Sequence, residues 1–391
     1  MIDTKTDGRV ARPAPASPSL SRLLARARRP DILAQAILIL VLVIGGWIAA
    51  SEISANLARL SVKSGYGFLF EEAQFELGES LIPFRAGDSY FRAFAAGLMN
   101  TLKVAGIGIV LSTVVGLVIA LGQLSPSFVV ARACRLYVDV IRNVPLLLQL
   151  IFWHTVITSS LPTVRNALSP VDGVFLTNRG LYLPAPIWDP SHMTVLGIAV
   201  AALAGAAGLY LLTRRFALSL FVFAAAIALG FVAVGAPLEL DTPRLAGFNF
   251  KGGWEISPEF GAMLLGLTLY VGAFNAEIIR AGILGVDKGQ REAGGALGLK
   301  PWQVMRKIIL PQALRIILPS ITNSYLNLTK ESSLAVAIGY PEIVRVSNIA
   351  VFETGQAIEC ISIVMIIYLC LSLITSLILN WLNARAKLVE R

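Results

Sequence analysis

Eight long apolar runs occur along the chain, and more polar stretches of varied length separate them. A membrane-spanning helix needs roughly 20 mostly apolar residues, because the bilayer core is about 30 Å thick and a helix rises 1.5 Å per residue. The pattern therefore predicts an all-α, polytopic membrane protein with about eight transmembrane helices. The predicted spans cover about residues 32–50, 98–122, 138–160, 194–212, 216–235, 260–284, 316–338 and 360–382.

The same pattern divides the chain into three parts. Residues 1–31 are rich in Ala, Pro, Ser and Arg and predict a disordered basic arm. Residues 32–97 hold the first span, interpreted as a signal anchor, and a polar segment that predicts a lid or a short surface helix. Residues 98–391 form the main transmembrane domain, with two extra spans inserted at about 194–235 and a polar loop at 285–315.

Composition excludes a soluble globular domain. Of the residues, 56% are hydrophobic and 15% are charged, whereas about 25% are charged in soluble domains. The mean hydropathy is +0.72. Three cysteines give no even disulfide framework, and two histidines without Cys or His at ligand spacing give no basis for a metal site. We therefore expect neither a metal nor a catalytic residue in this chain.

Basic residues are divided unevenly between the two sides that these spans define. If the N-terminus is cytoplasmic, segments on the cytoplasmic side hold 22 Lys and Arg residues and those on the other side hold nine. The positive-inside rule therefore predicts that both termini and the polar loop at 285–315 are cytoplasmic. This distribution explains the net charge of +9. Because basic residues gather at span ends rather than on one face, we expect no nucleic-acid partner.

The polar loop reads "EAGGALGLKPWQVMRKIILP" from Glu292 to Pro311. Before it, Asp287 and Gln290 predict a capping pair at the start of a first short helix. Gly298 can end that helix with a positive φ, and Pro301 can begin a second one. The loop therefore predicts a compact helix–turn–helix on the cytoplasmic face. The alternative is an amphipathic helix that only anchors the loop to the membrane surface.

Polar residues recur inside the seventh span. They follow helical spacing at Ser320, Asn323, Asn327 and Lys330, with Glu331 beside them. Such side chains at membrane depth usually face protein or water and mark a pathway for substrate, and Glu277 in the sixth span is a further candidate. Two alternatives stay open. Lys330 and Glu331 can snorkel from the outer end of the span, and Glu277 can pair with Arg280 one turn away.

The second and third spans carry packing signals. In the second span, small residues recur at every fourth position, at Gly108, Ser112, Gly116 and Ala120. This small-residue face predicts the close approach of another helix. In the third span, Pro145 predicts a helix start after a cytoplasmic turn. His154 in the same run is interpreted either as a packing residue or as part of a pathway.

Two other classes of protein are disfavoured. A secondary transporter is expected to show two sequence halves with paired broken helices, and no such repeat is present. A membrane enzyme is expected to carry a set such as H-E-x-x-H or G-x-S-x-G, and neither motif occurs. The chain also lacks the G-x-x-x-x-G-K-S/T loop that binds nucleotide phosphates, so we expect no ATPase site of its own.

Several motifs resemble those of one known family. One motif is similar to the EAA loop of ABC-importer permease subunits. It reads Glu292-Ala293-Gly294, three residues, Gly298, nine residues, and then Ile308-x-Leu310-Pro311. The segments "RNVPLLLQL", "AFNAEIIRAGI" and "LTKESSLAVAIGYPEI" resemble segments of the polar amino-acid permeases. The chain departs from the family pattern at Asn143, Val144 and Gly294. With its extra first span and its two inserted spans, the chain resembles in architecture the larger permease subunit of general L-amino acid transporters.

The resemblance implies a type I ABC-importer permease core, at 98–160 and 260–382, with a cytoplasmic coupling helix. It implies a bacterial inner-membrane subunit that translocates L-amino acids, with ATP and Mg bound by a partner ATP-binding subunit and no cofactor in this chain. The other implied partners are a second homologous permease subunit, a periplasmic amino-acid-binding protein and membrane lipid. The residues expected to couple to the ATPase are Glu292, Ala293, Gly294, Gly298, Ile308, Leu310 and Pro311.

Overall fold

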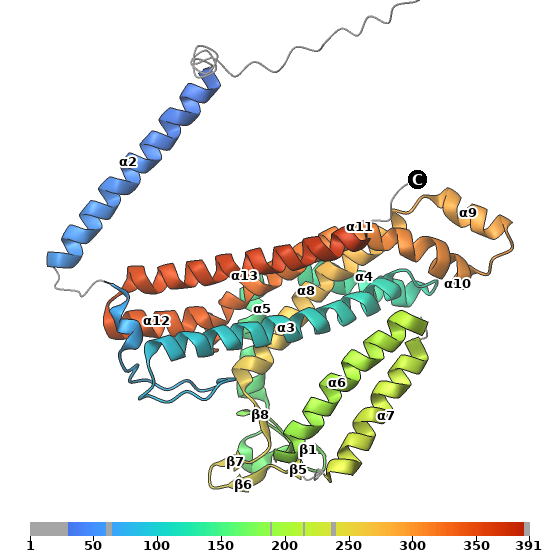
Figure 1. Cartoon of the computed structure of the whole chain (residues 1–391), viewed down its shortest axis with the longest axis horizontal. Coiled ribbons are helices and arrows are strands. Elements are labelled where there is room, and N and C mark those ends of the chain that lie inside the picture. Colours follow the sequence, from blue (N-terminus) through green and yellow to red (C-terminus); the bar gives the residue numbers. More distant parts are fainter. Residues whose placement is uncertain (1–29, 60–64, 188–189, 214–215, 236–239, 387–391) are drawn as a thin grey trace, which may run out of the picture. The chain divides into compact units, whose positions relative to one another are not determined.

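The computed structural model describes residues 30–59, 65–187, 190–213, 216–235 and 240–386 (Figure 1). The chain divides into two units, Met1–Gly65 and Tyr66–Arg391. The described part of the first unit is one helix, α2 (Pro30–Arg59), and its large apolar side chains between Ile37 and Ile48 are exposed. The predicted basic arm at 1–31 lies outside the described residues, apart from its last two positions.

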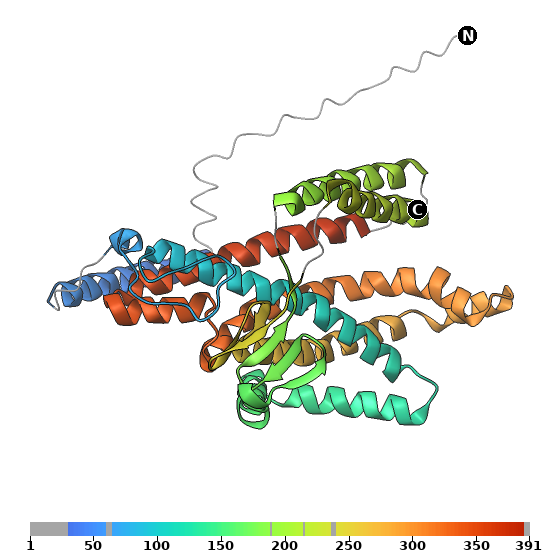
Figure 2. The same ribbon diagram turned by 90° about the horizontal axis from the view of Figure 1, so that it is seen from below.

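The body of the second unit is a bundle of long helices arranged around α8 (Pro258–Leu284), as Figures 1 and 2 show. Helix α8 packs along α3, α5 and α11, and α4 also lies against it, while α12 and α13 pack on each other. The bounds of these helices are Tyr90–Gln123 (α3), Phe128–Asn143 (α4), Leu146–Ser160 (α5), Leu310–Glu331 (α11), Ile343–Thr354 (α12) and Ala357–Ala386 (α13).

The small-residue face of α3 explains how α8 approaches so closely. Gly108, Ser112, Gly116 and Ala120 are all buried. A Cβ atom added at Gly116 would lie 2.6 Å from Asn275 Cβ on α8. A larger residue would therefore force the two helices apart. The predicted close helix contact is confirmed, and it fixes α8 in the centre of the bundle.

The third predicted span is broken in the structure. Helices α4 and α5 meet at an angle of 104°. The break lies at Pro145, and Val144 before it is extended, with φ −98° and ψ 126°, because a following proline disfavours the helical conformation. The predicted helix start after Pro145 is confirmed. The structure divides the predicted span at about 138–160 between these two helices.

A second break follows α11. The chain continues as a 3-10 helix, η4 (Ser332–Ile338), and turns at Gly339, where φ is 83°. The fully buried Glu342 then begins α12, and its carboxylate accepts hydrogen bonds from the backbone N–H groups of Val344 at 2.9 Å and Arg345 at 2.8 Å. These bonds satisfy donors that the first turn of a helix leaves free. The helices on the two sides of the break are bent by 48°.

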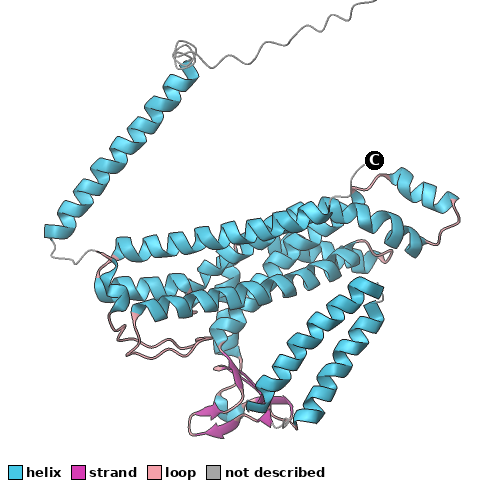
Figure 3. Cartoon of the chain, in the orientation of Figure 1, coloured by secondary structure: helices cyan, strands magenta, loops and turns pink. Residues whose placement is uncertain are grey.

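Short strands between α5 and α8 correct the predicted all-α fold, and Figure 3 shows them in magenta. The largest sheet is antiparallel, with the order β1-β2-β3-β8, and two further pairs are β4-β5 and β6-β7. The strands are Leu168–Val171, Val174–Thr177, Gly180–Leu183, Ala185–Pro186, Leu240–Asp241, Arg244–Ala246, Asn249–Lys251 and Trp254–Ile256, and a 3-10 turn, η2 (Val164–Asn166), precedes them.

Local sequence accounts for these strands. The β1–β2 hairpin turns at Asp172-Gly173, where Gly173 has φ 79°, a conformation that favours glycine. Gly180 has φ 134°, and a Cβ there would lie 2.4 Å from the Ile256 carbonyl oxygen, so glycine permits the pairing of β3 with β8. The strands were missed at the sequence level because they have only two to four residues.

A small core of its own stabilises this β-region. The rings of Phe175 and Phe250 stack with centroids 4.4 Å apart. The buried Tyr182 hydroxyl donates toward Asn249 Oδ1 at 2.8 Å and Glu255 Oε1 at 3.2 Å. Burial raises the pKa of Tyr182 to about 12, so its hydroxyl stays protonated and remains a donor at neutral pH.

The two inserted helices, α6 (Pro190–Thr213) and α7 (Phe216–Val234), run beside each other and pack together (Figure 1). Within the described residues, three helices are long and apolar enough to cross a membrane, or up to five if each bent pair is one span. The three are α3, α8 and α13. The other predicted spans, in α2, α6 and α7, hold described apolar stretches of only 10–17 residues. Every predicted span therefore coincides with a helical segment, whereas the number of crossings stays a prediction.

Candidate functional site

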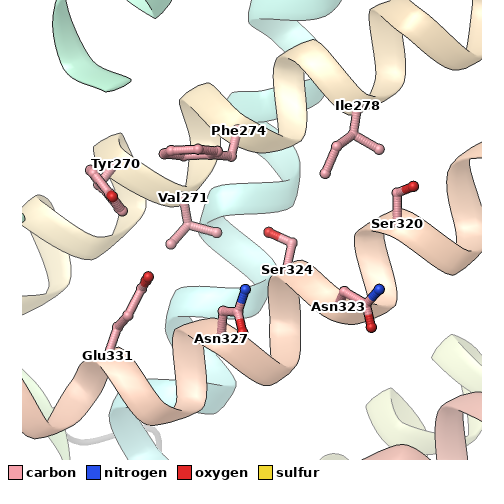
Figure 4. Close-up of a pocket in the computed structure, with 9 residues that line it drawn as sticks. All are labelled: Tyr270, Val271, Phe274, Ile278, Ser320, Asn323, Ser324, Asn327 and Glu331. Atoms are coloured by element: carbon pink, nitrogen blue, oxygen red, sulfur yellow. The ribbon is translucent and has the colours of Figure 1, made fainter. Parts of the chain in front are cut away.

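A pocket of about 240 Å³ lies between α8 and α11 (Figure 4). The α8 wall is aromatic and apolar, and the α11 wall is polar. Figure 4 shows the side chains of the two walls facing each other across the pocket. The α8 wall consists of Tyr270, Val271, Phe274 and Ile278, and the α11 wall consists of Ser320, Asn323, Ser324, Asn327 and Glu331.

The polar wall follows from helical spacing. Residues 320, 324, 327 and 331 recur every three or four positions and therefore share one face of α11. Ile321 and Leu328, on other faces of the same helix, are buried against apolar neighbours. The sequence pattern thus separates a face that packs from a face that lines the pocket.

The structure brings together four of the predicted pathway residues, namely Ser320, Asn323, Asn327 and Glu331. Lys330 is exposed and does not line the pocket. Glu277 also lies outside the lining and forms an ion pair with Arg280 one turn away, which is the alternative interpretation given above. The α8 wall was not predicted. Its only sequence signal is the placement of the aromatic residues Tyr270 and Phe274 four positions apart.

One cation lies beside the aromatic wall. The Arg142 guanidinium, at the end of α4, is 4.8 Å from the centroid of the Phe274 ring. This distance allows a cation–π interaction that holds the ring against the pocket. The bend between α4 and α5 therefore contributes to the pocket, because it places Arg142 next to α8.

A second, more polar cavity of about 460 Å³ lies where the β-region meets the start of α8. Its lining includes Arg179, Glu79, Glu255 and Glu259. The Glu79 carboxylate is held by Lys103 and by the Ser257 hydroxyl, and His154 Nε2 on α5 lies 3.8 Å from Glu259 Oε1. Glu259 and Phe274 are about 22 Å apart along α8 at 1.5 Å per residue, so the two cavities lie at successive depths along one helix.

The polar loop forms two short helices at the end of α8 remote from the β-region (Figure 1). Helix α9 (Lys288–Ala296) ends at Gly298, whose φ is 72°. The N–H of Gly298 bonds to the Gly295 carbonyl at 2.9 Å, and the N–H of Leu299 bonds to the Gly294 carbonyl at 3.2 Å. This is a Schellman motif, and it confirms the predicted positive φ.

The second helix of the loop begins as predicted, whereas the predicted capping pair is confirmed only at Asp287. Pro301 is the first residue of α10 (Pro301–Val304), which continues through one π-helical turn, η3 (Met305–Ile309), into α11. Asp287 caps α9 by accepting from the Gly289 N–H at 2.6 Å. The Gln290 side chain lies instead 3.3 Å from Gln312 Nε2, because the loop folds back on α11.

The fold-back rests on one glycine. A Cβ at Gly294 would lie 2.9 Å from Val304 Cγ2 and 3.0 Å from Ile308 Cδ1. Glycine therefore lets α9 contact α10 and η3. The remaining predicted coupling residues, Glu292, Ala293, Leu310 and Pro311, are exposed, whereas Ile308 is half-buried.

Two large apolar side chains on this loop were not predicted as functional. Leu297 is 78% exposed and Trp302 is 57% exposed, and both flank the Gly298 turn. Exposed aliphatic and aromatic side chains beside a rigid turn favour a protein partner, because their burial would stabilise a complex. Among the described residues, no group of three His, Cys, Asp or Glu side chains could hold a metal ion.

A polar pocket inside a bundle of apolar membrane helices is typical of a transport protein. The sequence model of the family "Binding-protein-dependent transport system inner membrane component" matches residues 216–388. The chain is 43% identical to the general L-amino acid transport system permease protein AapQ of Rhizobium johnstonii, over 92% of this chain and 93% of that protein. It is 40% identical to the putative amino-acid ABC transporter permease protein YhdX of Escherichia coli, over 91% and 94% of the two chains.

A third relative is the glutamate/glutamine/aspartate/asparagine transport system permease protein BztB of Rhodobacter capsulatus, 34% identical over 95% of this chain and 97% of the relative. Among solved structures, a crystal structure of an amino acid ABC transporter with histidines is 25% identical, covers 76% of this chain and 95% of that chain, and gives a TM-score of 0.48. The chain belongs to the permease subunits of amino-acid ABC transporters. It is thus a bacterial inner-membrane protein whose ATPase is a separate subunit.

Proposed function

We propose that this chain forms part of the path by which L-amino acids enter the cell, with ATP hydrolysis in the partner subunit driving the transfer. The observation that carries the proposal is the pocket between α8 and α11, where amide, hydroxyl and carboxylate groups face an aromatic wall within the bundle. An amino acid needs such groups, because its charged ammonium and carboxylate lose their water on leaving the aqueous phase. The names of the relatives support amino acids as the substrate class.

The second cavity extends the proposed path toward the periplasm. It carries charges of both signs, which suits a substrate that is itself a zwitterion. Substrate released by a periplasmic amino-acid-binding protein would reach this cavity first and the pocket next, about 22 Å further along α8. A second homologous permease subunit would complete the wall of the path, and a heterodimer is the arrangement we favour.

The loop from Glu292 to Pro311 is the proposed contact with the ATP-binding subunit, which would hold ATP and Mg. The exposed Leu297 and Trp302 would bury their side chains in a groove of that subunit. The contact of Gly294 with Val304 and Ile308 makes the loop rigid, so a movement of the ATPase would be passed to α11 through η3. Because α11 carries the polar wall, such a movement would change the pocket.

The same proposal sets the topology: eight spans, cytoplasmic termini, a transmembrane domain over 98–391 and a cytoplasmic loop at 285–315. Alkaline phosphatase, which is active only outside the cytoplasm, is expected to be active when fused after Glu76, Pro170 or Gly252. It is expected to be inactive when fused after Ser125 or Lys300, and a green fluorescent protein at those two positions should fluoresce. An active phosphatase at Lys300 would contradict a cytoplasmic coupling loop.

The function itself is tested by uptake of labelled L-glutamate and L-glutamine into vesicles that contain this chain and its partners. Uptake is expected to require ATP and the ATP-binding subunit. Uptake driven by an ion gradient alone would support the competing class, a secondary transporter.

A further inference from the structure

A chain of hydrogen bonds runs from the pocket into the interior of the bundle. The Ser324 hydroxyl on α11 donates to Asn275 Oδ1 on α8 over 2.7 Å. Asn275 Nδ2 donates to the Ser112 hydroxyl on α3 over 3.4 Å, and that hydroxyl donates to the Ile109 carbonyl oxygen over 3.2 Å. Asn275 is fully buried and does not line the pocket, and its hydrogen bond to the pocket is the one with the lining residue Ser324.

The direction of these bonds follows from the chemistry of their last member. A backbone carbonyl can only accept, so the Ser112 hydroxyl must donate to Ile109. Its oxygen then has only lone pairs left for Asn275, which must turn its amide NH₂ toward Ser112 and its carbonyl oxygen toward Ser324. Ser324 in turn gives its single proton to Asn275. The lone pairs of the Ser324 oxygen therefore stay free on the pocket side.

We propose that Asn275 is a positioning residue for substrate recognition: it holds Ser324 as a hydrogen-bond acceptor for the α-ammonium group of the amino acid. The inference rests on the proposed function of the pocket and deepens it. Without Asn275, the Ser324 hydroxyl is free to rotate and to present its proton to the substrate instead, and a donor facing an ammonium group is unfavourable. Packing against Gly116 keeps the Asn275 side chain in place.

A matched control is available in the same pair of helices. Thr113 on α3 and Tyr325 on α11 share a hydrogen bond of 2.7 Å between their hydroxyl oxygens. Neither residue lines the pocket. Thr113→Val removes an interhelical hydrogen bond of the same length as the Ser324–Asn275 bond, together with the bond of Thr113 to the Ile109 carbonyl at 2.6 Å, and nearly preserves shape. It therefore reports an upper limit for the effect of losing such an interhelical bond.

The experiment is equilibrium binding of labelled L-glutamate and L-glutamine to the purified complex in detergent, without any binding protein. Asn275→Ala and Ser324→Ala are each expected to weaken binding about fivefold, the size of one lost hydrogen bond, and the double variant is expected to weaken it by the same factor. Thr113→Val is expected to bind as the unmodified complex does. Asn275→Asp, as a neutral carboxyl group, keeps a carbonyl oxygen for Ser324 and an O–H donor for Ser112, and is expected to bind within about twofold of it. Thermal unfolding of each complex measures stability separately.

The outcomes are distinct. Independent effects that multiply to about 25-fold in the double variant would overturn the proposal, because the residues would not act through each other. Equal losses in Asn275→Ala and Thr113→Val would also overturn it, since the role of Asn275 would then be structural. A loss for L-glutamine alone would assign the donor to the side-chain amide and overturn the ammonium assignment. If the unmodified complex bound neither probe, the proposed function of the pocket would fail first, and the inference with it.

Discussion

Gly298→Asp is expected to insert into the membrane normally and yet to lose both its ATP-binding subunit and amino-acid uptake. Gly298 has φ 72° and no neighbouring atom within 4 Å, so the added side chain projects from the turn rather than into the protein. The positive φ costs an L-residue about 1 kcal/mol, too little to unfold the bundle. The new carboxylate would instead enter the proposed groove beside Leu297 and Trp302, and a buried unpaired charge is expected to weaken association about a hundredfold or more.

The measurement is the amount of ATP-binding subunit that copurifies with a tagged permease. The control is Gly235→Asp at the end of α7, where φ is 63° and no atom lies within 4 Å, so the backbone cost and added charge are the same. That variant is expected to retain its ATPase. If Gly298→Asp bound the ATPase fully, the coupling role would be wrong, and the loop would be interpreted as a membrane-surface anchor instead.

The second large effect is expected in the pocket. Asn323→Leu and Asn327→Leu keep the number and branching of the side-chain heavy atoms but replace the hydrogen-bonding amide with hydrocarbon. Both residues line the polar wall, so each variant is expected to lower the rate of uptake about tenfold or more, since a charged substrate then lacks a partner in the pocket. The yield of assembled complex is expected to be unchanged, because neither residue lies on the proposed ATPase contact.

Thr322→Val is the control for these substitutions. Thr322 lies on the same helix, is buried, and bonds to the Leu318 carbonyl of its own helix at 2.7 Å rather than to the pocket. It is expected to retain uptake. Normal uptake by both Asn variants would show that the polar stripe of α11 serves only packing.

Sequence reasoning succeeded where one segment carries the whole signal. The positive φ of Gly298 and the helix start at Pro301 follow from rules that act within four residues, and the structure has both. The polar wall of α11 could be predicted for the same reason, because its residues recur on one helical face. The small residues of α3 likewise predicted a close helix neighbour without naming it as α8.

Sequence reasoning failed where contacts between segments distant in sequence determine the structure. The aromatic wall of the pocket exists only because α8 packs opposite α11, and nothing near Tyr270 or Phe274 in sequence indicates that partner. The size of the bend at Pro145, 104°, depends on how α4 and α5 pack against α8, which the local sequence does not show. The strands between α5 and α8 are too short for an alternating pattern to stand out, although Asp172-Gly173 is a hairpin signal that could have been used.

The central claim is that this chain moves amino acids with energy supplied by a separate ATPase, and reconstitution into liposomes tests it most directly. The chain, a second permease subunit and the ATP-binding subunit would be incorporated together, with labelled L-glutamate or L-glutamine and the binding protein outside and ATP inside. We predict uptake that requires ATP hydrolysis, stops when the ATP-binding subunit is omitted and is absent with Gly298→Asp. Uptake that continued without ATP or without that subunit would contradict the account.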